Sequence, residues 1–126
     1  MSLKYIAVEG CTLEFQVEGA SGNIEITGTP STKVKADGKA VYKEIKFSIS
    51  NYNGGAVTNS DGTGTGSIIA SAQHVKVEGN AVILEGDVSA TVEISGTTTT
   101  SSGPTPVTTT DVVKVTAAGQ SKVKGA

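Results

Sequence analysis

The chain has 126 residues, ten lysines, no arginine and twelve acidic residues, which give a formal net charge of -2. This length predicts a single domain over residues 1–126. The lack of arginine and the 4% aromatic content exclude the phosphate clamps and stacking platforms of a nucleic-acid-binding protein. With one cysteine and one histidine there are few groups for nucleophilic or metal chemistry, so we expect neither an enzyme nor any catalytic residue.

Alternation of apolar and polar residues with a period of two runs along most of the chain. It is clearest in residues 41–49, where Val41, Ile45, Phe47 and Ile49 share one face. The predicted strands are, in chain order, residues 6–8, 13–17, 24–27, 41–49, 75–77, 82–84, 88–94 and 112–115. No stretch keeps an apolar stripe at helical spacing, so we predict an all-β fold with almost no helix.

Two stretches depart from this alternation. Residues 51–66 hold five glycines, and residues 95–110 are rich in Thr and Ser and contain Pro104 and Pro106. Both are predicted to be loop-like insertions. The alternative is that such segments lie extended on a sheet, because threonine is a good strand residue.

A short unit recurs along the chain. Lys33–Val41 aligns without gaps to His74–Val82, and weaker copies lie at residues 6–13 and 113–123. Each unit predicts a β-hairpin, with glycines at positive φ in the turns; these are Gly10, Gly38 and Gly79. The near-equal spacing favours short hairpins packed with pseudo-threefold symmetry, although a chance similarity of common Val-Lys-Val strands is the alternative.

The first two units resemble a known family. Thr29–Val41 is similar to the signature of the PAAR-repeat proteins, in which a small-Ser-Pro stretch leads into a valine strand and an Asn-Gly or Asp-Gly turn. The second unit, continued by Val82–Asp87, resembles the same hairpin followed by that family's Gly-Asp pair. PAAR proteins form the conical tip on the spike of type VI secretion systems, phage tails and related contractile particles. The resemblance therefore implies a small conical domain that is structural rather than catalytic.

The resemblance also bears on metal binding, because many PAAR tips hold a metal ion near the apex through several histidines and a cysteine. This sequence offers only His74 and Cys11, and His74 takes the place of Lys33 in the aligned unit. We therefore expect no metal ligand and no cofactor. The alternative is a metal ion whose ligand set is completed by carboxylates. Cys11, next to a turn glycine, is expected to be a small apolar residue rather than a nucleophile.

The partner that the resemblance implies is a homotrimeric spike protein, capped by one copy of this chain, with transient contact to a target membrane. Our candidates for the face toward the spike are five apolar residues: Ile6, Val8, Val34, Val75 and Val113. Each of these also fits the inward face of its own hairpin, so a place in the core is the alternative.

The N-terminal residues do not read as a charged leader followed by an apolar stretch, so we expect no cleaved signal peptide. This favours assembly in the bacterial cytoplasm into an injection particle or a virion. The alternative function is a secreted or surface β-sandwich that binds carbohydrate or other ligands, or a decoration protein of a virus particle. The Thr, Ser, Gly and Asn content suits that role as well.

Overall fold

A computed structural model describes residues 3–126, and its regular elements are all β-strands. The all-β prediction is confirmed, and no element in this range is a helix that could cross a membrane. The strands are β1 (Lys4–Tyr5), β2 (Thr12–Phe15), β3 (Ser21–Ile26), β4 (Thr29–Ala36), β5 (Lys39–Glu44), β6 (Lys46–Gly54), β7 (Val57–Ser67), β8 (Lys76–Val77), β9 (Asn80–Ala81), β10 (Val92–Thr100), β11 (Gly103–Asp111), β12 (Val113–Ala117) and β13 (Lys124–Gly125).

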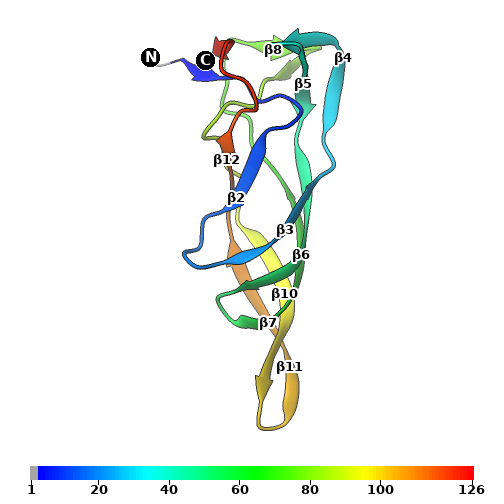
Figure 1. Cartoon of the computed structure of the whole chain (residues 1–126), viewed down its shortest axis with the longest axis vertical. Coiled ribbons are helices and arrows are strands. Elements are labelled where there is room, and N and C mark those ends of the chain that lie inside the picture. The colour runs from blue at the N-terminus through cyan, green and yellow to red at the C-terminus, as the bar shows by residue number, and fades with distance from the viewer. Residues whose placement is uncertain (1–2) are drawn as a thin grey trace.

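The molecule is elongated and tapers from one end to the other (Figure 1). The broad end, which we call the base, carries β1, β13, β8, the C-terminus and the turn between β4 and β5. The narrow end, which we call the tip, is the far part of the β10–β11 hairpin, residues 97–106. This outline agrees with the expected cone.

Five strands form the central antiparallel sheet, in the order β11-β10-β7-β6-β3. Four two-stranded sheets surround its upper part: β1 with β13, β2 with β12, β4 with β5, and β8 with β9. Because β11 continues into β12 after a single residue, the central sheet and the β2–β12 pair share one chain path. The tip is therefore an extension of the central sheet.

The prediction that residues 51–66 form a loop is wrong, because all of them except the two turn residues 55–56 belong to β6 and β7. The glycines of β7 alternate with threonines and occupy positions where no side chain fits. A Cβ atom on Gly62 would lie 2.8 Å from Cγ2 of Ile94 and 2.8 Å from Cβ of Tyr52. One on Gly66 would lie 2.8 Å from Cζ of Phe47. Here glycine allows close packing of strands.

Residues 95–110 are likewise strands rather than a loop. β10 and β11 pair without interruption from Val92 opposite Asp111 to Thr100 opposite Gly103. Gly103 follows the two-residue turn at φ +98°, the arrangement of a turn closed by a G1 bulge. Pro104 and Pro106 are tolerated because β11 is an edge strand, where a missing N–H breaks no ladder bond.

Two clusters of buried apolar side chains form the core. The larger one lies under the central sheet, and its largest side chains are Tyr52 and Phe47. The predicted apolar face of residues 41–49 is buried, although the chain is divided at Ile45 into β5 and β6 and Tyr42 is buried too. The smaller cluster lies toward the base and consists of Ile6, Val8, Ala36, Val41, Ala72, Val77, Val82 and Leu84.

The repeat appears in the structure as two hairpins of the same geometry. Asp37-Gly38 joins β4 to β5 and Glu78-Gly79 joins β8 to β9, and all four residues have positive φ, as in a type I′ turn. Gly10 also has positive φ, so all three predicted turn glycines are confirmed. The strand Val113–Val115, however, pairs with β2 instead of a return strand of its own. The pairing of the described strands does not show a threefold repeat.

Candidate functional site

The five residues predicted to face a partner fall into two groups. Ile6, Val8 and Val113 are buried in the two core clusters and do not reach the surface, so their assignment to a partner-facing sheet is wrong for the folded chain. Segments distant in the chain pack over these side chains, which alternation within a single hairpin cannot reveal. Val34 is 40% exposed and Val75 is half-buried, so these two remain candidates at the base.

The base is held together first by a contact between the two repeat hairpins. The hydroxyl of Ser31, on β4, donates a hydrogen bond of 2.5 Å to the carboxylate of Glu78 in the β8–β9 turn. The same hydroxyl oxygen accepts from the N–H groups of Lys33 and Val34. The Ser31 hydroxyl holds the pKa of Glu78 below its usual value, and the nearby Lys43 acts in the same direction.

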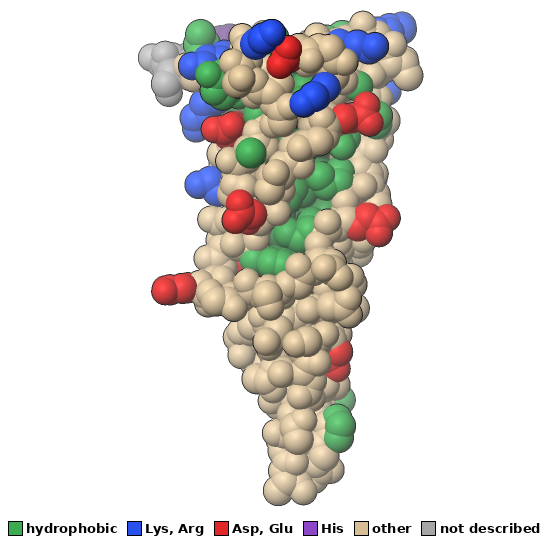
Figure 2. Space-filling view, viewed as in Figure 1, with side chains coloured by type: hydrophobic (Ala, Val, Ile, Leu, Met, Phe, Trp, Pro, Cys, Tyr) green, Lys and Arg blue, Asp and Glu red, His purple; other side chains and the backbone are tan. Residues whose placement is uncertain are grey.

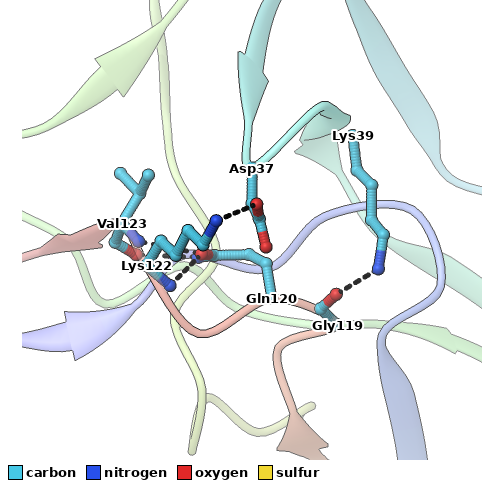
Figure 3. Close-up of polar contacts among 6 residues, drawn as sticks. All are labelled: Asp37, Lys39, Gly119, Gln120, Lys122 and Val123. Carbon is cyan, nitrogen blue, oxygen red and sulfur yellow. Dashed lines mark hydrogen bonds and ion pairs between the residues drawn. The ribbon is translucent and has the colours of Figure 1, made fainter.

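A second contact closes the base around the C-terminal segment (Figure 3). The side-chain amide of Gln120 donates to the carbonyls of Ile6, at 2.9 Å, and of Val123, at 2.7 Å. Its oxygen accepts from the N–H groups of Lys122 and Val123, each at 2.8 Å. One buried side chain therefore joins the residue that follows β1 to the residues that precede β13.

The Asp37-Gly38 turn is tied to that same C-terminal segment. Lys39 Nζ donates to the carbonyl of Gly119 at 2.7 Å, and Lys122 Nζ lies 3.4 Å from the carboxylate of Asp37 (Figure 3). These exposed contacts are individually weak, because water competes for both partners. Together with Gln120 they fix the position of the turn relative to the chain end.

The base presents apolar side chains that the alternation did not single out. Leu3 is 60% exposed and Val123 is 38% exposed, and both lie beside the β1–β13 pair. Together with Val34, they give the base three exposed apolar side chains that a partner could cover. Figure 2 shows lysines gathered around this end of the molecule, whereas the lower half of the same face carries none.

The tip has the opposite chemistry, since residues 94–110 contain no charged side chain. Its threonines are held to β7 by their side chains. Thr97 donates to Asp61 through both its N–H, at 2.8 Å, and its hydroxyl, at 2.5 Å, and these bonds hold the pKa of Asp61 below its usual value. Asn59 bridges Thr97 and Thr99 at 3.0 and 3.1 Å. Below the apolar core, therefore, side-chain hydrogen bonds from threonine hydroxyls hold β10 to β7.

Cys11 and His74, the two candidate residues for nucleophilic or metal chemistry, do not form a reactive site in the structure. Burial raises the pKa of the Cys11 thiol to about 11, so the thiol is protonated near neutral pH. His74 is exposed, and its backbone N–H donates to the carbonyl of Ala126. Among residues 3–126 no three His, Cys, Asp or Glu side chains are grouped as a metal site would require.

The Gly-Asp pair at Gly86-Asp87 has a structural role. The carboxylate of Asp87 is buried and accepts from the N–H of Leu84, at 2.9 Å, and from the N–H and hydroxyl of Ser71. The N–H of Asp87 returns a bond to the carbonyl of Leu84 at 3.0 Å. The turn is thus closed from both sides, with Gly86 at positive φ.

Comparison of the chain with family models, with curated proteins and with solved structures finds no match. A function for this chain must therefore be argued from its own surfaces. The two that differ most are the base, with its lysines and separate apolar side chains, and the charge-free tip.

Proposed function

We propose that this protein is a non-catalytic spike tip, one copy of which caps a trimeric β-helical spike of a contractile injection system or phage tail. The observation that carries the proposal is the gradient along the molecule. A broad base with exposed apolar side chains narrows to a single hairpin without charges. This gradient suits a body that is bound at one end and penetrates with the other.

The base supplies the features that attachment requires. Leu3, Val34 and Val123 offer apolar surface, and its removal from water stabilises a complex by roughly 25 cal/mol per Å². The contacts of Gln120 and Ser31 keep this end rigid before binding, so little conformational freedom is lost on association. The lysines around the base would favour a spike whose end is acidic.

The tip supplies the features that puncture requires. Moving a charged group into the membrane interior is costly, whereas hydroxyl groups that are already hydrogen-bonded cost much less. The pairing of β10 with β11 and the contacts of Thr97 and Thr99 with β7 provide such bonds. The prolines of β11 remove donors from its outer edge, which protects the hairpin from pairing with other strands.

The proposal is tested by mixing the chain with the purified trimeric spike protein of the same particle and measuring stoichiometry by native mass spectrometry. We expect one copy per trimer. Val34→Asp should remain folded and abolish the complex, because a charge would then face the contact surface. Val88→Asp, at an equally exposed valine outside the base, is the matched control and should bind normally. Three copies per trimer, or no complex with the unmodified chain, would reject the proposal.

A further inference from the structure

The strands β2 and β3 follow one another in the chain but do not pair. β2 pairs with β12 and β3 pairs with β6, so each strand has one edge without a partner strand. They are joined by the five residues 16–20, a length that usually closes a hairpin. Instead they diverge from this connection (Figure 1), and we call the space between them the seam.

A buried carboxylate keeps the connection away from hairpin geometry. Asp111, at the end of β11, accepts hydrogen bonds of 3.0 Å from the N–H groups of both Gln16 and Val17. Its other oxygen accepts from the hydroxyl of Tyr52 at 2.7 Å. The start of the connection is thus fixed to β11. The seam is therefore held open by specific contacts.

The backbone groups that face the seam follow from the ladders on its two sides. Alternate residues of an antiparallel strand bond to the same neighbour. The N–H of Gln16 bonds to Val112 beside β12, so Leu13 and Phe15, of the opposite parity, turn their backbone groups toward the seam. The N–H of Thr27 bonds to Lys46 beside β6, so Ile24 and Ile26 do the same from the other side.

The seam contains a groove of about 310 Å³ that is lined by both apolar and polar residues. Its apolar side chains, Leu13, Phe15, Ala20 and Ile24, are half-buried against the larger core cluster, and Glu14, Ser21 and Gly22 complete the lining. Figure 2 shows an apolar strip in the middle of the face on which β2 and β3 lie. If a further strand were inserted into the seam, every second side chain of that strand would pack on this apolar strip.

The rims of the seam are acidic. Glu14 on β2 and Glu25 on β3 are exposed beside the apolar residues, and Glu18 lies in the connection between the strands. Residues 5–32, which include both strands, contain four glutamates and no lysine. Lys114 stands opposite Glu14, but on the β12 side. An inserted strand would therefore point its outward side chains between carboxylates.

We propose that the seam binds one extended segment of a partner protein, with apolar residues at every second position and lysine or arginine between them. The segment pairs with β2 and β3 at once, packs its apolar side chains on Leu13, Phe15 and Ile24, and directs its basic side chains toward Glu14 and Glu25. Binding by strand addition takes its affinity from backbone bonds and its specificity from the alternating side chains. The inference is independent of capping, because the seam lies on the side of the molecule below the base.

The test uses the intact chain and a capped peptide of about seven residues in which valine and lysine alternate, since β3 spans six residues. Binding is followed by amide hydrogen exchange resolved by NMR. We expect exchange to slow at least tenfold at Leu13, Phe15, Ile24 and Ile26. The amides of Glu14 and Glu25 already face neighbouring strands and should change little. Uniform slowing along both strands, or none, would overturn the proposal.

The contribution of the acidic side chains to peptide binding is tested with charge-removing variants. Glu14→Gln and Glu25→Gln should each weaken binding of the peptide about two- to fivefold, as for exposed ion pairs. Glu93→Gln, which removes an exposed charge from β10, is the matched control and should not. A peptide with glutamate in place of lysine should bind at least tenfold more weakly, and equal binding would reject the basic partner. Protection of the same four amides in a dimer without peptide would assign the seam to a second copy and also reject the proposal.

Discussion

The base and the tip hold the same kind of strand pairs together by different means. Near the base, apolar side chains such as Val41, Val77 and Leu84 fill a cluster, and turns and side chains close it. In the central sheet above the tip, Gly62, Gly64 and Gly66 of β7 lie directly against buried side chains, among them Tyr52, Phe47 and Ile94, and so the strands pack closely around these side chains. Below them, threonine hydroxyls bond strand to strand. The apolar core thus ends above the tip, where hydrogen bonds between side chains replace apolar packing in joining β7 to β10.

The largest effect is expected where the two regions meet, at Asp111. Asp111→Ala should lower the free energy of unfolding by about 3–5 kcal/mol, because it leaves the N–H of Val17 and the hydroxyl of Tyr52 without their acceptor. Urea denaturation provides the measurement. Asp61→Ala, at an exposed carboxylate that accepts from Thr97, is the comparison and should cost under about 1 kcal/mol. Equal effects would contradict the distinction between a buried junction and an exposed tip.

The next largest effect tests the glycine face of β7. Gly62→Val should cost roughly 2–4 kcal/mol, because its side chain overlaps Ile94 and Tyr52. Thr63→Val, one residue along and exposed, should change stability by less than about 0.5 kcal/mol. Thermal unfolding of both variants decides the point. Equal melting temperatures for the two variants would show that steric overlap is not the reason for glycine at position 62.

A smaller effect is expected at the base, where glycine serves backbone conformation. Gly79→Val should cost roughly 1–2 kcal/mol, because a β-branched residue is strained at φ +85° although nothing lies within 4 Å of its Cβ position. Gly79→Asn should cost less, since asparagine tolerates this region. Chemical denaturation that ranks valine no worse than asparagine would show that the turn relaxes without strain.

The smallest effect on stability is expected at the end of the tip. Ser101→Lys should change the free energy of unfolding by less than about 0.5 kcal/mol, because Ser101 is exposed in a turn. If the proposed function holds, the same variant should still cap the spike but release less dye from lipid vesicles, with Ser101→Ala as the uncharged control. Unchanged dye release would remove the argument that a charge-free tip aids puncture.

The sequence predicted those features that depend on neighbours in the chain. Alternation identified the all-β class and the buried face of residues 41–49. The aligned turns identified Gly38 and Gly79 as equivalent positions, because an acidic-Gly pair between two short strands suits a type I′ turn. The sequence-based prediction failed for residues 51–66 and 95–110. Their glycine, threonine and proline content favours loops, but pairing with neighbouring strands makes these residues part of the central sheet.

By itself, then, the sequence determined the strand character of the alternating segments, the turn positions and the absence of charge from residues 94–110, since each of these is a property of residues adjacent in the chain. Only the tertiary structure decided that Val113 is core while Val34 is exposed, because a one-sided strand pattern cannot show whether a second layer covers its other face. It also decided that β2 and β3 stay apart, since the carboxylate responsible, Asp111, comes from a strand more than 90 residues away in the chain.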